Sequence, residues 1–111
     1  MKGVPVTSVA AYIRSKNAGP FRLTLDILFK TREVYDHVKE TSQVTPSLVA
    51  QLYRIPPEQI TDFVFFDPGK AIKITMQRRT SSGSTADTDI YGAQQHAPLL
   101  AIKFDLPDQL V

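Results

Sequence analysis

The clearest pattern in the sequence is an alternation of apolar and polar residues over residues 21–30, FRLTLDILFK. Every second residue of this segment, from Phe21 to Phe29, is apolar. A period of two places such side chains on one face of a β-strand. A second alternation, AIKITMQ over residues 71–77, sets two isoleucines and a methionine against Lys73 and Thr75. The sequence therefore predicts two strands that each turn one face toward a core.

Two helices are predicted between these strands. Thr31 can cap a helix that ends near Glu40, because threonine at this position accepts a hydrogen bond from the first turn. Thr45 can cap a second helix, and Pro46 then occupies the first helical position, where proline is tolerated. The second helix ends before the IPPEQ segment, and its apolar residues, Leu48, Val49, Leu52 and Tyr53, share one face.

Shorter patterns suggest the remaining elements. Residues 7–14 fit either a short helix or a first strand, and SKNAGP after them is typical of a turn. The aromatic run DFVFFD predicts a strand buried on both faces, followed by a tight turn at PGK. The last strand is expected in LLAIKFDL, with four residues facing the core: Leu100, Ile102, Phe104 and Leu106.

This element order predicts an α+β fold. It is close to the βαββαβ ferredoxin-like plan, with a mixed, mainly antiparallel sheet of about four strands and two helices on one face. We expect one domain over residues 1–111, with a core from about residue 7 to 106 and a frayed tail over 107–111. The second face of such a sheet has no helical layer, which favours self-association or docking to a partner.

Composition excludes several classes of function. The 111 residues contain no cysteine, so disulfides, thiolate zinc sites and cysteine nucleophiles are excluded. The net charge of +2 is too small and too dispersed for a typical nucleic-acid surface. Two histidines, with no helical pair spaced for zinc, predict neither a metal site nor a cofactor. No segment resembles a membrane span or a signal peptide, so we expect a cytoplasmic protein.

The segment RSKNAG is the first candidate for a binding site. Arg14, Ser15, Lys16 and Asn17 stand beside a glycine-containing turn, where backbone N–H groups and a guanidinium can hold a carboxylate or a phosphate. The simpler interpretation is a solvated turn between two elements.

The segment DTDIYGAQQHAPLL is the second candidate. Asp89 and His96 have side chains suited to acid–base chemistry, and Tyr91 and Gln95 could donate hydrogen bonds to a ligand held by the first segment. This interpretation requires the two segments to meet in space. The alternative is a polar loop that satisfies its own hydrogen bonds over the sheet.

Three segments together resemble a known family: IRSKNAGPF, VFFDPGKAIKIT and SGSTADTDIYGAQQHAPLL. It consists of small proteins of unknown function encoded beside, or fused to, AtuA-type (acyclic terpene utilisation) proteins, and the resemblance runs from about residue 7 to 104. The chain is also similar to the small C-terminal domain of AtuA-type proteins, described as ferredoxin-like. There an ARSGDKG-like turn stands where this chain has IRSKNAG, without the second glycine–aspartate pair.

The resemblance implies a small subunit that works with a larger AtuA-type protein. The large component is associated with catabolism of branched or unsaturated carboxylic acids and their thioesters. A shared site would draw on residues from both candidate segments: Arg14, Lys16, Asn17, Asp89, Tyr91 and His96. The alternative is a stand-alone hydro-lyase or isomerase acting on a carboxylic acid or acyl-thioester at a homo-oligomer interface. There Asp89 or His96 would act as the base, while Arg14 and Lys16 hold the carboxylate.

Overall fold

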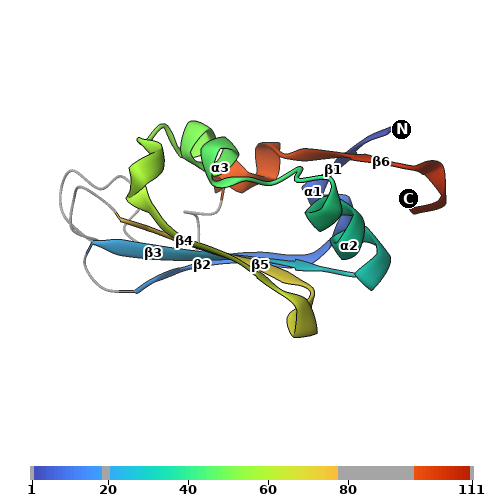
Figure 1. Cartoon of the computed structure of the whole chain (residues 1–111), viewed down its shortest axis with the longest axis horizontal. Helices are drawn as coiled ribbons and strands as arrows, with labels where there is room; N and C mark the ends of the chain where they lie inside the picture. Colours follow the sequence, from blue (N-terminus) through green and yellow to red (C-terminus); the bar gives the residue numbers. More distant parts are fainter. Residues whose placement is uncertain (1, 19–20, 78–96, 111) are drawn as a thin grey trace.

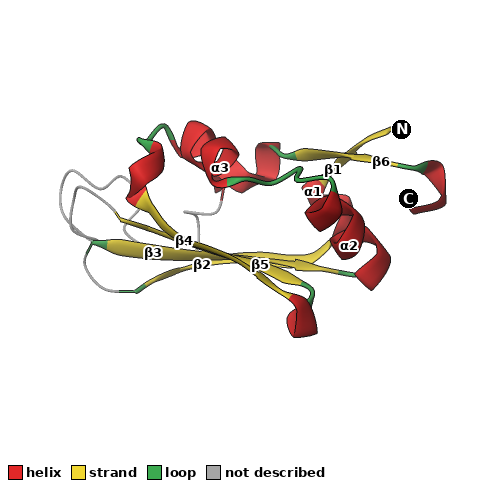
Figure 2. Cartoon of the chain, in the orientation of Figure 1, coloured by secondary structure: helices red, strands yellow, loops and turns green. Residues whose placement is uncertain are grey.

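The computed structural model describes residues 2–18, 21–77 and 97–110, which form an α+β fold with two antiparallel sheets (Figures 1 and 2). One sheet has four strands in the order β2-β3-β5-β4, and the other pairs β1 with β6. The strands are β1 (Lys2–Pro5), β2 (Ala10–Asn17), β3 (Arg22–Phe29), β4 (Ile60–Phe66), β5 (Ala71–Gln77) and β6 (Lys103–Leu106). The helices are α1 (Val6–Val9), α2 (Arg32–Glu40) and α3 (Pro46–Tyr53).

The two alternating segments form the centre of the larger sheet, as predicted. β3 and β5 are neighbours, and Leu25 lies opposite Ile74 in their antiparallel register. Both side chains are fully buried, as is Ile27 on the same face. Removing this apolar face from water supplies the main favourable term for folding.

The two predicted helices begin where their caps were expected. The Thr31 hydroxyl accepts a hydrogen bond from the Val34 N–H at 3.3 Å, and the Thr45 hydroxyl accepts one from Leu48 at 3.1 Å. Both helices lie on the same side of the four-stranded sheet (Figure 1). Among the described helices, none has the length and apolar character needed to cross a bilayer.

Strand β4 differs from its prediction. It lies at an edge of the sheet, next to β5 only. Phe63 and Phe65 pack against the core, whereas Val64 and Phe66 are 49% and 44% exposed. The prediction that DFVFFD is buried on both faces is therefore wrong, because the described helices cover only one side of the sheet.

Residues 7–14, for which the sequence fitted either a helix or a strand, contain parts of both. The single turn α1 is followed by β2, which continues through Arg14 to Asn17. The prediction of a turn starting at Ser15 is wrong, because this segment is paired residue by residue with β3, from Ile13 opposite Ile27 to Asn17 opposite Leu23. Extending the β2–β3 ladder gives the backbone N–H and C=O groups of these residues hydrogen-bond partners.

The last strand does not join the four-stranded sheet. β6 pairs with β1, an N-terminal strand that the sequence analysis missed, so the ferredoxin-like strand order is not confirmed. The segment Ala97–Ala101 is a 3₁₀ helix, which buries Leu99 and leaves Leu100 44% exposed, contrary to prediction. After β6, Asp108–Leu110 forms a further 3₁₀ turn, and Leu110 packs against the core.

One glutamine side chain completes the pairing of β6. The Gln43 amide accepts a hydrogen bond from the Asp105 N–H at 2.7 Å and donates one to the Asp105 carbonyl at 2.9 Å. Gln43 therefore occupies the place that a neighbouring strand would take. This contact links the segment between α2 and α3 to the small sheet.

Candidate functional site

The candidate site is the face of the four-stranded sheet turned away from α2 and α3 (Figure 1). Cross-strand register aligns its outward-facing residues in three rows. The rows are Tyr12–Leu28–Ala71–Phe66, Arg14–Asp26–Lys73–Val64 and Lys16–Thr24–Thr75–Asp62. We call these twelve residues the outer face. No described helix or strand covers it.

The second row contains a shared ion pair. Arg14 Nε lies 3.3 Å from Asp26 Oδ2, and Lys73 Nζ lies 3.5 Å from Asp26 Oδ1. The Asp26 side chain is only 14% exposed, whereas those of Arg14 and Lys73 are 59% and 45% exposed. The carboxylate therefore lies beneath two cations that reach into solvent.

Apolar and aromatic side chains flank this ion pair. Tyr12 and Phe66, at the two ends of the first row, are 48% and 44% exposed. The Arg14 guanidinium lies over the Tyr12 ring at 5.1 Å from its centroid, and the Lys73 ammonium lies 5.6 Å from that of Phe66. Such contacts are attractive and hold the cations close to the aromatic rings. Large exposed apolar side chains gathered on one face are typical of an interaction surface.

A glycine in the turn after β4 makes room for one of these rings. A Cβ atom at Gly69 would lie 2.9 Å from Phe66 Cδ2, closer than van der Waals contact permits. The Phe66 ring therefore packs directly against this turn, which restricts its position on the outer face.

A hollow of about 470 Å³ opens beside the ion pair. Its lining residues are Arg14, Ser15, Lys16, Thr24 and Asp26. Arg14 binds Asp26 through Nε, and no bond to its terminal guanidinium nitrogens is found among the described residues. Lys16 likewise has no polar partner in the described part of the chain, so two cations and a threonine hydroxyl are available to an anion.

The side chains of the four residues predicted from RSKNAG are divided between the two faces of the sheet. They lie in β2, where successive side chains point to opposite faces of the sheet. Arg14 and Lys16 belong to the outer face, while Ser15 and Asn17 lie on the same side as Ile13, toward the helices. The Ser15 hydroxyl is buried and has no hydrogen-bond partner among the described residues. The two cations Arg14 and Lys16 therefore share one surface, whereas the glycine of this segment lies outside the described residues.

The second candidate segment lies outside the described residues. This applies to Asp87, Asp89, Tyr91, Gln95 and His96, so their expected meeting with β2 stays a prediction. Within residues 2–18, 21–77 and 97–110, no three His, Asp or Glu side chains lie close enough to hold a metal ion.

His37 lies in the second half of α2. The residue is half-buried, and its Nε2 atom is buried without a hydrogen-bond partner in the part of the chain that the structure describes.

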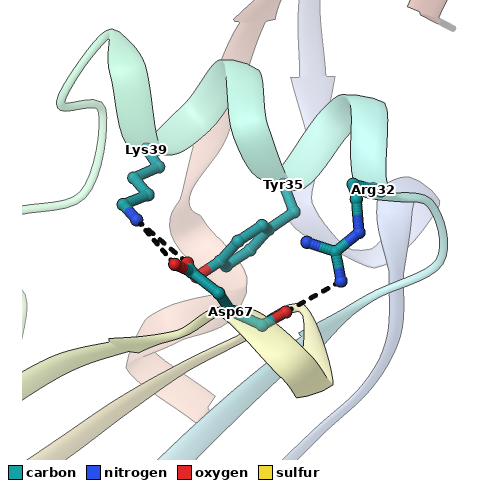
Figure 3. Close-up of polar contacts among 4 residues, drawn as sticks. All are labelled: Arg32, Tyr35, Lys39 and Asp67. Atoms are coloured by element: carbon teal, nitrogen blue, oxygen red, sulfur yellow. Dashed lines mark hydrogen bonds and ion pairs between the residues drawn. The ribbon is translucent and has the colours of Figure 1, made fainter.

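A polar cluster fixes the β4–β5 turn to α2 (Figure 3). Asp67 accepts hydrogen bonds from the Tyr35 hydroxyl at 2.5 Å and from Lys39 Nζ at 2.9 Å, and Arg32 donates to its backbone carbonyl at 2.8 Å. The bonds from Tyr35 and Lys39 hold the pKa of the Asp67 carboxyl below its ordinary value of 3.8. Burial, and next the bond to Asp67, raise the pKa of the Tyr35 phenol. The cluster thus anchors the hairpin that carries Val64 and Phe66.

Sequence reasoning missed several outer-face residues. Asp26 interrupts an apolar strand, and the register shows that it lies between Arg14 and Lys73. The alternation in residues 71–77 did place Lys73 outward. Val64 and Phe66 were assigned to the core, because an aromatic run gives no information on which side of a strand is covered.

The fold and the outer face define a small α+β domain in which one sheet face has no covering helix among the described residues. The chain belongs to the family described as domain of unknown function DUF4387, which it matches over residues 6–103. No curated protein and no solved structure shows a significant match to it.

Proposed function

We propose that the protein is a non-catalytic or co-catalytic small subunit that docks on a larger protein through the outer face. The observation that carries the proposal is the exposure of Tyr12, Val64 and Phe66 around the Arg14–Asp26–Lys73 ion pair. Exposed aromatic and apolar side chains next to arginine are the typical composition of a protein interface.

The larger partner that we propose is an AtuA-type protein in catabolism of organic acids or acyl-thioesters in the cytoplasm. This part of the proposal rests on the sequence resemblance described above. The edges of the outer face are held by separate contacts, β2 by its ladder with β3 and the β4–β5 turn by Asp67. A rigid surface favours docking because little conformational entropy is lost on binding.

Co-expression with an AtuA-type protein from the same organism tests the proposal. We expect the two proteins to co-elute in size-exclusion chromatography, with a fixed stoichiometry by light scattering. The double variant Val64→Ser, Phe66→Ser should abolish co-elution. Leu100→Ser is the matched control, because Leu100 is equally exposed but lies in the 3₁₀ helix Ala97–Ala101, outside the outer face. Separate elution of the two wild-type proteins would contradict the proposal.

A second candidate is a stand-alone hydro-lyase or isomerase acting on a carboxylic acid or acyl-thioester. It is favoured by the hollow that presents Arg14 and Lys16 together. In this proposal the two cations hold the substrate carboxylate, and a base from the Asp89–His96 segment removes a proton. Turnover of unsaturated carboxylates or acyl-thioesters by the purified chain alone, lost in Arg14→Ala, would favour this function over the subunit role.

A further inference from the structure

We infer that the hollow on the outer face receives a carboxylate side chain, Asp or Glu, from an acidic surface of the protein partner. This inference rests on the docking role proposed above and names the chemistry of the partner. It depends on three observations, which concern the charge of the face, the free hydrogen-bonding groups in the hollow and the apolar side chains around them.

The described residues on this side of the sheet carry more positive than negative charge. Arg22, at the end of β3, also faces outward, because its neighbour Leu23 faces the core. The described cations of this side are then Arg14, Lys16, Arg22 and Lys73, and the described carboxylates are Asp26 and Asp62. Since Asp26 is shielded beneath two of the cations, the potential toward a partner is positive.

The groups in the hollow that have no partner among the described residues match a carboxylate. The Arg14 guanidinium uses Nε for Asp26, so its outer nitrogens can bind a second carboxylate in a fork. Lys16 stands two residues along the same strand, roughly 7 Å away in backbone spacing, and Thr24 lies directly across from it. Two donors from β2 and one from β3 therefore line the hollow, which gives one carboxylate room to contact them together.

A second copy of this chain is a poor occupant. Two outer faces brought together would oppose Arg14, Lys16 and Lys73 of one copy with the same cations of the other. Like charges facing one another across an interface cost several kcal/mol. An acidic protein surface gains attraction from the same cations instead.

A small free anion is also less favourable than a side chain. Arg14 and Lys73 are about half exposed, so water weakens their attraction for a solute that leaves the hollow open. A carboxylate carried on a protein surface that also covers Tyr12 and Val64 excludes this water. The apolar contacts thus strengthen the charge contact at the centre of the interface.

Matched charge reversals on the co-expressed complex test the inference. Lys16→Glu should weaken the affinity for the larger AtuA-type protein roughly tenfold or more. Lys103→Glu makes the same change at an exposed position of β6, away from the outer face, and should leave the affinity within about twofold. Titration calorimetry of the purified components measures both. The affinity of the wild-type protein should fall with added salt, and the affinity of Lys16→Glu should fall less steeply.

Carbodiimide cross-linking gives an independent readout, because it joins an amine to a carboxylate only in direct contact. We expect a cross-linked peptide that joins Lys16 to an Asp or Glu of the larger protein. A cross-link from Lys16 to a second copy of this chain would overturn the inference. A stable complex in which Lys16→Glu behaves as Lys103→Glu, and Lys16 is not cross-linked, would overturn it while leaving the subunit role intact. Absence of any complex would instead refute the subunit role itself.

Discussion

The Tyr35 hydroxyl donates a 2.5 Å hydrogen bond to the Asp67 carboxylate, joining the middle of α2 to the turn between β4 and β5. The phenol is almost fully buried, while the carboxylate faces solvent and also binds Lys39. This contact connects the helical layer to the hairpin that carries half of the outer face.

Loss of this contact should weaken the fold. Tyr35→Phe removes the donor but keeps the buried ring, so we expect the free energy of unfolding to fall by about 1 kcal/mol at pH 7. Urea denaturation followed by circular dichroism measures it. Tyr12→Phe is the control, because the Tyr12 hydroxyl has no described partner, and it should change stability by less than about 0.5 kcal/mol. Equal effects of the two variants would refute the role of the hydrogen bond.

The same contact should make stability depend on pH at both extremes. The pKa of Asp67 is lower in the folded than in the unfolded state, so its contribution is present above pH 3.8 and is lost as the pH falls through the folded pKa. The pKa of Tyr35 is higher in the folded state, so its contribution is present below pH 10.0 and is lost as the pH rises above that value.

Denaturation of the wild type and of single variants across the pH range checks these signs. The stability advantage of the wild type over Asp67→Asn should shrink below pH 3.8, and its advantage over Tyr35→Phe should shrink above pH 10.0. Differences that stay constant through both ranges would mean that neither group has a shifted pKa in the folded protein.

The shared ion pair on the outer face should show non-additive energetics. Arg14→Ala and Lys73→Ala should each cost about 0.5 kcal/mol or less, because the remaining cation still binds Asp26. The double variant should cost more than the sum, since it leaves a carboxylate of only 14% exposure without a described cation. A double-mutant cycle in urea measures the coupling, and strict additivity would contradict it.

Replacing Gln43 by a carboxylate should destabilise the small sheet in a pH-dependent way. Gln43→Glu at pH 7 keeps the acceptor for the Asp105 N–H but loses the donor to its carbonyl, so we expect a cost of about 1–3 kcal/mol. Near pH 4 the introduced carboxyl begins to protonate and can donate again, so part of the loss should be recovered. Gln51→Glu, at an exposed position of α3, controls for the added charge and should show neither effect.

A pair of matched truncations compares the outer face with the buried core, to which Val44 contributes from the segment between α2 and α3. Val64→Ala on the outer face should change stability by about 0.5 kcal/mol or less. Val44→Ala makes the same change at a side chain that is 1% exposed and should cost about 2 kcal/mol. Thermal and urea unfolding of both variants provide the comparison. Similar costs would mean that the Val64 side of β4 is covered in the isolated protein.

Local sequence signals predicted the interior of the larger sheet and both long helices. The alternations in β3 and β5 sufficed because each has one buried and one solvated face, so period and burial coincide. The caps Thr31 and Thr45 were also predictable, since a cap is a contact within one turn of the chain. The outer face could be predicted only as a surface without helices, not as a set of residues.

Non-local pairing decided what the sequence analysis missed. Residues 14–17 look like part of a turn in isolation, but their ladder with β3 extends the strand to Asn17. The partner of β6 is β1, from the opposite end of the chain, and no local pattern identifies a partner that distant. The Arg14–Asp26–Lys73 ion pair likewise joins three strands, and its residues meet only because the strand register places them opposite one another.

The sequence by itself therefore determined which residues form the core strands, where α2 and α3 begin, and that the fold is α+β. These properties depend on side-chain periodicity and on contacts between near neighbours, both of which can be read along the chain. The tertiary structure alone decided the strand order, the edge position of β4 and the gathering of Arg14, Lys16 and Lys73 on a face that no described helix covers. Those features depend on which strands pair and on which side of the sheet the helices pack. Both are determined when the apolar residues of all elements are buried in one common core.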